Sequence, residues 1–183
     1  MAMKKSTLAV LLVVFFVAVT GCASKKIAPG ITPVTNFDSN RYLGQWYEIA
    51  RMDEFFERGL YNVTATYSLN DNGTIKVVNR GYKLADEQWK SITGKARFVG
   101  DDTTAHLQVS FFGPFYASYV VFDLDAEYQY AFVTGSNKEI LWLLAREPEV
   151  SDELLARFKI EATNQGYDLS NMIFDVQREE LPR

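Results

Sequence analysis

The feature that most constrains this chain is a series of short, apolar-rich runs, each closed by a tight turn. Turn clusters of the hairpin type interrupt the sequence at residues 70–73, 100–102, 123–126 and 135–138. No long crossover segment separates the runs, so neighbouring strands are expected to pair antiparallel. The runs predict eight strands, over residues 44–51, 62–69, 75–83, 89–99, 105–111, 115–123, 128–134 and 140–145. A meander of eight such strands predicts an up-and-down arrangement that closes into a barrel.

Alternation within the runs predicts which side chains face inward. In residues 61–69 and 105–111 apolar side chains take every second position, and His106, Gln108 and Ser110 fall between them. One face of these strands is therefore expected to be apolar and the other to be in water. The runs 115–123 and 140–145 are apolar on both faces, so another element is expected to cover their outer side.

One amphipathic helix is predicted after the last of these strands, and it supplies that cover. Ser151 is suited to the N-cap, acidic residues follow it in the first turn, and Gly166 is suited to end the helix. Its apolar side chains share one face at helical spacing, which predicts packing on the barrel wall. They are Leu154, Leu155, Phe158 and Ala162. Residues 174–177 predict a short ninth strand.

The N-terminus predicts export and lipid attachment. Two lysines, Lys4 and Lys5, precede an apolar run over residues 8–19 that is too short to span a bilayer comfortably. The run ends in residues 19–22, which resemble the lipobox of bacterial lipoproteins, and Cys22 is the only cysteine. We therefore expect a signal peptide at 1–21, a lipidated tether at 22–36, one folded domain at 37–177 and a flexible tail at 178–183. Ala23 in place of aspartate favours, by the same resemblance, the outer membrane.

Composition limits the classes of molecule that the protein is expected to bind. Cleavage before Cys22 lowers the count of basic residues from 19 to 17 and changes the net charge from −4 to −6. An acidic protein is not suited to bind nucleic acid, or to bind anionic lipid electrostatically through basic residues. Membrane attachment would therefore depend on acyl chains. The many aromatic residues (13 Phe, 10 Tyr and 3 Trp) favour β-structure with an apolar cavity.

A longer motif identifies the family that the chain resembles. Residues 42–51, Tyr-Leu-Gly-Gln-Trp-Tyr-Glu-Ile-Ala-Arg, resemble the opening motif of the lipocalins. Residues 56–60, 63–67 and 109–115 are similar to the bacterial outer-membrane lipoprotein (Blc-type) lipocalins, a branch related to apolipoprotein D and the plant temperature-induced lipocalins. The resemblance covers residues 37–177. It implies an eight-stranded antiparallel up-and-down lipocalin barrel, mainly β, with one C-terminal α-helix on the wall.

The same resemblance implies a function. The expected protein binds apolar ligands, such as fatty acids or lysophospholipids, in its barrel, for lipid storage, transport or membrane maintenance. It would face the periplasm from the outer membrane, and the resemblance favours a homodimer. Gly44, Trp46 and Arg146 are expected to be structural, with the guanidinium stacked on an indole that plugs one end of the barrel. The inward positions expected to line the pocket are Tyr61, Val63, Tyr67, Leu107, Val109, Phe111 and Tyr119.

Other interpretations stay open at this point. The inward side chains would serve equally well as core, in an envelope lipoprotein that holds no ligand. A lipid-modifying enzyme is disfavoured, because the only histidine, His106, is expected on a polar face and Glu48 and Glu57 are expected at the surface or in ion pairs. Neither a metal ion nor a cofactor is expected. The aromatic residues at 55–56 and 111–116 are expected in mouth loops, where they would gate the pocket, touch membrane or form a dimer contact.

Overall fold

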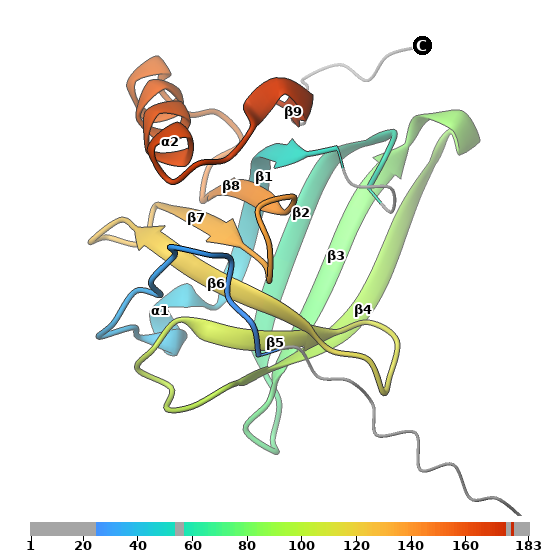
Figure 1. The fold of residues 1–183 in the computed structure, drawn as a ribbon. Coiled ribbons are helices and arrows are strands. Elements are labelled where there is room, and N and C mark those ends of the chain that lie inside the picture. The colour runs from blue at the N-terminus through green and yellow to red at the C-terminus, as the bar shows by residue number, and fades with distance from the viewer. Residues whose placement is uncertain (1–24, 54–56, 175–176, 178–183) are drawn as a thin grey trace, which may run out of the picture.

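The chain folds into a closed antiparallel β-barrel. The computed structural model describes residues 25–53, 57–174 and 177. Each strand pairs with the next in sequence, and β1 pairs with both β2 and β8, which closes the sheet (Figure 1). The strands are β1 (Gly44–Met52), β2 (Leu60–Leu69), β3 (Ile75–Lys83), β4 (Gln88–Phe98), β5 (His106–Ser110), β6 (Ala117–Leu124), β7 (Tyr130–Thr134) and β8 (Leu141–Ala145). The predicted eight-stranded meander is confirmed, with strand ends that shift by one or two residues.

Helix α2 (Asp152–Asn164) covers the outer side of the barrel, as predicted. The Ser151 hydroxyl accepts a hydrogen bond from the backbone N–H of Leu154 at 3.3 Å, and Gly166 follows the helix with a positive φ of 79°. Phe158 is fully buried, and its ring meets that of Phe132 on β7 at a centroid distance of 4.9 Å. A second apolar core therefore lies outside the barrel, beneath α2, in addition to the one inside.

The expected ninth strand at residues 174–177 is wrong in position. The strand is β9 (Met172–Ile173), and it pairs with the end of β1. A short 3-10 helix, η2 (Leu169–Asn171), precedes it and brings the chain onto β1 earlier than the sequence indicated. Residues 175–176 lie outside the described residues. The Gln177 side chain donates to the carbonyl oxygens of Glu48 and Val63, and so joins β1 to β2.

Part of the segment expected to be a tether packs on the barrel. Ala28 and Ile31 are buried in the outer core. The chain then runs beside β6, where the Val34 N–H donates to the Val121 carbonyl at 2.9 Å, and it leads into helix α1 (Ser39–Tyr42) (Figure 1, blue). Helix α1, which the sequence did not predict, lies at one end of the barrel, and the 3-10 helix η1 (Leu84–Asp86) joins β3 to β4 at the other.

The outer face of β5 is not in water, contrary to expectation. His106, Gln108 and Ser110 alternate with inward residues as predicted, but all three are buried. The imidazole Nε2 of His106 lies 3.0 Å from the Ser118 hydroxyl of β6, and the Arg97 Nε of β4 donates to the Gln108 side-chain oxygen at 3.2 Å. Polar side chains of the neighbouring strands therefore cover this face.

Candidate ligand-binding cavity

One end of the barrel is closed by an indole beneath a guanidinium. Trp46 is fully buried, and the Arg146 guanidinium carbon lies 3.9 Å from its ring centroid. Arg146 donates to the carbonyl oxygens of Arg41, Gln45 and Tyr128 at 2.7, 2.8 and 3.2 Å. Burial lowers the pKa of Arg146, but a guanidinium stays charged at physiological pH. The contacts tie α1 to the ends of β1 and β8.

Glycine is required where this closure is tightest. Gly44 has a φ of 95°, in the left-handed region, and a Cβ there would lie 3.3 Å from Nη1 of Arg146. The space beside Gly44 lets the guanidinium reach its carbonyl partners. The structure thus places Gly44, Trp46 and Arg146 together, at the closed end.

A layer of three tyrosines separates this closed end from the rest of the interior. The Tyr119 hydroxyl lies 2.7 Å from that of Tyr42 and 2.9 Å from that of Tyr67. Burial raises the pKa of all three phenols, that of Tyr67 to about 12, so they remain neutral. Beside this layer lies a void of only about 10 Å³, which holds no more than one water molecule. The hydroxyls satisfy one another, and the closed half of the barrel is filled.

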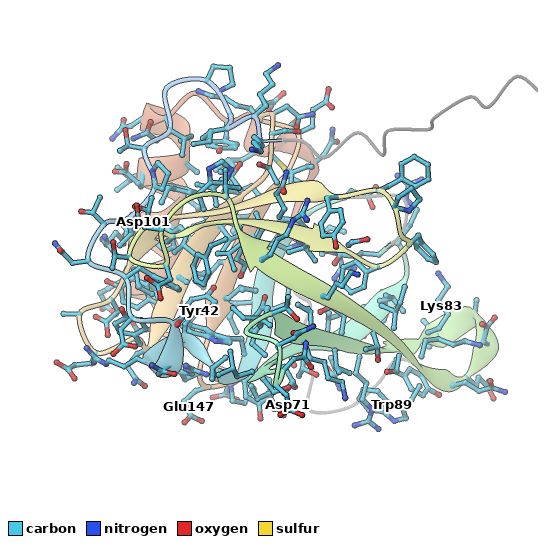
Figure 2. All side chains as sticks on the ribbon, turned by 90° about the horizontal axis from the view of Figure 1, so that it is seen from below. Tyr42, Asp71, Lys83, Trp89, Asp101 and Glu147 are labelled. Atoms are coloured by element: carbon cyan, nitrogen blue, oxygen red, sulfur yellow. The ribbon has the colours of Figure 1, made fainter. Side chains whose placement is uncertain are left out.

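The other half of the barrel is hollow. A cavity of about 810 Å³ opens at the end opposite α1, within the range of about 300–1,000 Å³ that is typical of small-molecule sites. In Figure 2, Asp101 and Glu147 lie at the closed end, and Lys83 and Trp89 lie at the open end. The wall is mainly apolar. Its apolar members include Leu60, Val63, Ala65, Val77, Ile92, Val109, Phe111, Trp142 and Leu144.

Five of the seven side chains predicted to line a pocket border this cavity, namely Val63, Tyr67, Val109, Phe111 and Tyr119. Leu107 borders only the small void near the closed end. The strand of Leu107 was assigned correctly, but the sequence did not show how far the packed side chains extend from the closed end of the barrel toward the open end.

Tyr61 does not line the cavity, so this prediction is wrong. The pairing of β2 with β3 slips between Tyr61 and Thr64, and Asn62 has a φ of 49°. A bulge of this kind inserts an extra residue and changes which side chains face inward. Leu60 consequently borders the cavity in place of Tyr61.

A buried ionisable cluster forms one part of the cavity wall. The Arg51 Nη1 donates to the Glu48 carboxylate at 2.7 Å, and its Nη2 donates to the backbone carbonyls of Glu57 and Leu60. The indole N–H of Trp142 donates to the Glu57 carboxylate at 3.2 Å, and the two carboxyl side chains hydrogen-bond to each other. Glu48 and Glu57 both border the cavity. Of the two alternatives expected for them, a surface position is wrong because both are buried, and an ion pair is confirmed for Glu48.

The charge state of this cluster follows from its burial. Desolvation raises the pKa of Glu48, and it outweighs the opposing attraction of Arg51. The hydrogen bonds from Arg51 and Glu57 oppose this shift and favour the ionised form of Glu48, which pairs with the Arg51 guanidinium. Two buried polar atoms, the Arg51 Nε and the side-chain oxygen of Asn79 on β3, have no hydrogen-bond partner among the described residues. Asn79 borders the cavity, so a ligand or water that donates a hydrogen bond can reach it.

Sequence reasoning missed this cluster, although part of it was detectable. Trp46 faces inward, so strand alternation predicts that Glu48 also faces inward. Arg51 faces inward only because the pairing of β1 with β8 slips between Glu48 and Ala50. That slip depends on how β1 and β8 pair and not on the residues of β1 alone.

The described residues offer few groups for catalysis. Residues 25–53, 57–174 and 177 contain no group of three or more His, Cys, Asp or Glu side chains placed to hold a metal ion. His106 is on the outer face of β5, away from the cavity, and burial lowers its pKa. In the same part of the chain no helix is long and apolar enough to cross a membrane.

Comparison with known proteins agrees with this architecture. The family model for the lipocalin-like domain matches residues 37–177. The chain is 51% identical over 156 residues to the outer membrane lipoprotein Blc of Citrobacter freundii, covering 85% of this chain and 88% of that protein. It is 47% identical over 171 residues to the protein of the same name in Vibrio cholerae, covering 93% and 99%. Insecticyanin from the tobacco hornworm has a similar fold, with a TM-score of 0.64 at 19% identity, covering 85% and 89%.

Proposed function

The chain belongs to the lipocalin family, and from that premise we propose that it is an outer-membrane-anchored lipocalin that binds lipids in its barrel. The proposed ligands are fatty acids or lysophospholipids. The proposed role is storage, transport or maintenance of membrane lipid on the periplasmic side. Cys22 would carry the acyl anchor, in keeping with the relatives named outer membrane lipoproteins.

The observation that carries this proposal is the division of the barrel into a filled half and a hollow half. A core that existed only for stability would be packed throughout, because interiors reach crystal-like density and each void costs stability. Here close packing stops at the tyrosine layer, and about 810 Å³ is left open toward one end. An apolar cavity with a single opening suits one elongated apolar ligand.

The distribution of charge supports an amphipathic lipid with its head at the mouth. Lys83 and Lys90 border the open end of the cavity, where Lys90 pairs with Asp86 at 2.9 Å. Among the described residues, the cations that border the cavity are Arg80, Lys83 and Lys90, all toward the mouth, where Arg80 lies over the Trp89 ring. Arg51, deeper in the barrel, is paired with Glu48. We therefore expect the apolar tail to point toward Tyr67 and an anionic head to remain near the two lysines.

The test is to identify lipid that co-purifies with the protein from native membranes, by mass spectrometry, and to repeat the measurement with two matched variants. Val109→Asp places an unpaired carboxylate in the cavity and is expected to abolish retention of lipid. Lys95→Asp, on the outer face of the neighbouring strand β4, is expected to retain it. Gln108, one residue from Val109, is unsuitable as the control because it is buried and bonded to Arg97.

The outcomes separate the candidate functions. Lipid that is retained unchanged by the wild type and lost in folded Val109→Asp supports binding. A wild-type protein that retains no lipid at all would support a structural envelope lipoprotein instead. Incubation with membrane lipid extract distinguishes the third candidate, because an enzyme would return a chemically altered product.

A further inference from the structure

The N-terminal segment begins at the open end of the barrel. The Ala28 N–H donates to the carbonyl of Gly135 at 3.2 Å, and Gly135 lies in the β7–β8 loop together with Ile140, which borders the cavity. From there the chain runs down the wall to the closed end, where the Phe37 N–H donates to the Thr103 carbonyl at 2.8 Å. The blue segment of Figure 1 follows this path toward α1. The part of the chain that the structure describes therefore begins on the side of the mouth.

The chain between this point and the proposed anchor is short. Cys22 lies six residues before Ala28, and six residues span at most about 20 Å when fully extended. Strand β6, along which the N-terminal segment runs, has 8 residues and measures about 26 Å at about 3.3 Å per residue. A tether that starts near the mouth does not reach back along this wall and past the closed end. The short tether therefore keeps the mouth near the membrane and the closed end of the barrel away from it.

The mouth carries exposed aromatic side chains. Phe112 and Phe115, in the β5–β6 loop, are 72% and 60% exposed, and Trp89, at the start of β4, is 45% exposed. Phe112 and Phe115 also border the cavity. Exposed aromatic side chains at the opening of a lipid-sized cavity mark a surface that contacts membrane or a partner. Trp is enriched at the interfacial region of a bilayer, and the phenylalanine rings would leave water there.

The closed end has the opposite character. Its loops present acidic side chains, which an anionic lipid surface would repel. These are Asp71, Asp101, Asp102, Asp125, Glu127, Glu147 and Glu149. The open end mixes charges, with Lys83 and Lys90 beside Asp86. Figure 2 shows Asp101 and Glu147 far from Lys83 and Trp89 along the barrel.

We propose that the barrel docks mouth-down on the bilayer that holds its acyl anchor, with Phe112, Phe115 and Trp89 in the interfacial layer. This inference rests on the proposed lipid attachment at Cys22. The ligand then passes between membrane and cavity without crossing bulk water. Lys83 and Lys90 lie at the level of the lipid headgroups, where they contact the head of the departing or arriving lipid.

A spin label read at two matched positions tests this orientation. Acylated Cys22 has no free thiol, so a cysteine introduced elsewhere is the only one that reacts with the label. Phe115→Cys labels the mouth and Leu69→Cys labels the closed end, at wild-type exposures of 60% and 61%. The full lipidated protein is placed in vesicles of phosphatidylethanolamine and phosphatidylglycerol. We expect the label at 115 to become more accessible to oxygen and less accessible to a water-soluble nickel chelate, and the label at 69 to stay as it is in water.

Other results would refute the orientation, the contact with lipid or the anchor separately. Equal accessibility at both positions, or a membrane-buried label at 69, refutes the mouth-down orientation. Short distances between labels at 115 in two copies, by pulsed dipolar spectroscopy, would show that a second protomer covers the mouth instead of lipid. An unmodified Cys22 in the intact mass would refute the anchor as well as the docking, whereas an acylated protein whose label at 115 stays in water refutes the docking alone.

Discussion

The closed end of the barrel allows a stability prediction with a magnitude. Arg146→Met removes three charge-assisted hydrogen bonds, to the carbonyls of Arg41, Gln45 and Tyr128, and the contact at 3.9 Å with Trp46. We assign about 1 kcal/mol to each hydrogen bond, at the low end because the site is partly open to water, and about 1 kcal/mol to the cation–π contact. Arg146→Met is therefore expected to lower the free energy of unfolding by about 4 kcal/mol. Arg146→Lys keeps the charge but not the planar fork, and it should recover less than half of this loss.

A double-mutant cycle isolates the contact between the two side chains. Urea unfolding of the wild type, Trp46→Phe, Arg146→Met and the double variant, followed by far-ultraviolet circular dichroism, should give a coupling energy of about 1 kcal/mol. Affinity for a fluorescent fatty acid per folded molecule should not change, because the tyrosine layer around Tyr119 separates Trp46 from the cavity. Wild-type stability of Arg146→Lys, or a loss of affinity without a loss of stability, would refute our assignment of these residues to structure.

Three further predictions concern separate parts of the chain. Cys22→Ser is expected to leave an uncleaved or mislocalised precursor, and an unmodified cysteine in the intact mass of the mature wild-type protein would contradict the lipobox assignment. Gly94→Ala would place a Cβ 2.6 Å from the Ser110 carbonyl oxygen and should cost about 1–3 kcal/mol in urea unfolding, whereas Gly100→Ala, whose Cβ has no neighbour within 4 Å, should cost much less. The raised pKa of Glu48 means that its protonated form favours folding, so this contribution is complete below the ordinary value of 4.5 and is lost as the pH rises through the folded-state pKa. The unfolding free energy of the wild type relative to Glu48→Gln should thus decrease from pH 4.5 toward neutrality, and an increase would show that Arg51 dominates.

The strands and α2 could be predicted because local sequence determines them. Hairpin turns set the strand boundaries, and a two-residue period sets the inward face wherever the pairing is regular, as at Val109 and Phe111. The same period failed at Tyr61, because a bulge depends on how two strands fit together and not on the residues of one strand. The outer face of β5 was misjudged for a related reason. The side chains that cover Gln108 belong to other strands, and their positions follow only from the closed barrel.

The apolar lining of the cavity could be predicted from the sequence, but its size could not. An apolar inner face is required both by a filled core and by a ligand site, and alternation does not distinguish them. The distinction comes from three tyrosines on α1, β2 and β6, far apart in the sequence. In the folded barrel the Tyr119 hydroxyl lies within 3 Å of the hydroxyls of Tyr42 and Tyr67. Their mutual hydrogen bonds make it possible to bury three polar groups at the bottom of an apolar pocket.

The buried charges of the cavity wall are compatible with the apolar ligand that we propose. A cavity of this size costs dispersion contacts that a filled core would make. The filled closed half, with Trp46 beneath Arg146, and the outer core beneath Phe158 offset this cost without occupying the pocket. The Glu48–Arg51 pair uses its charges on each other and on backbone carbonyls, so it presents no uncompensated cation to the ligand. An anionic head that moved deep into the barrel would be desolvated next to Glu57, while at the mouth it meets Lys83 and water. The paired charges of the barrel therefore favour the tail-in, head-out orientation that we propose for the lipid.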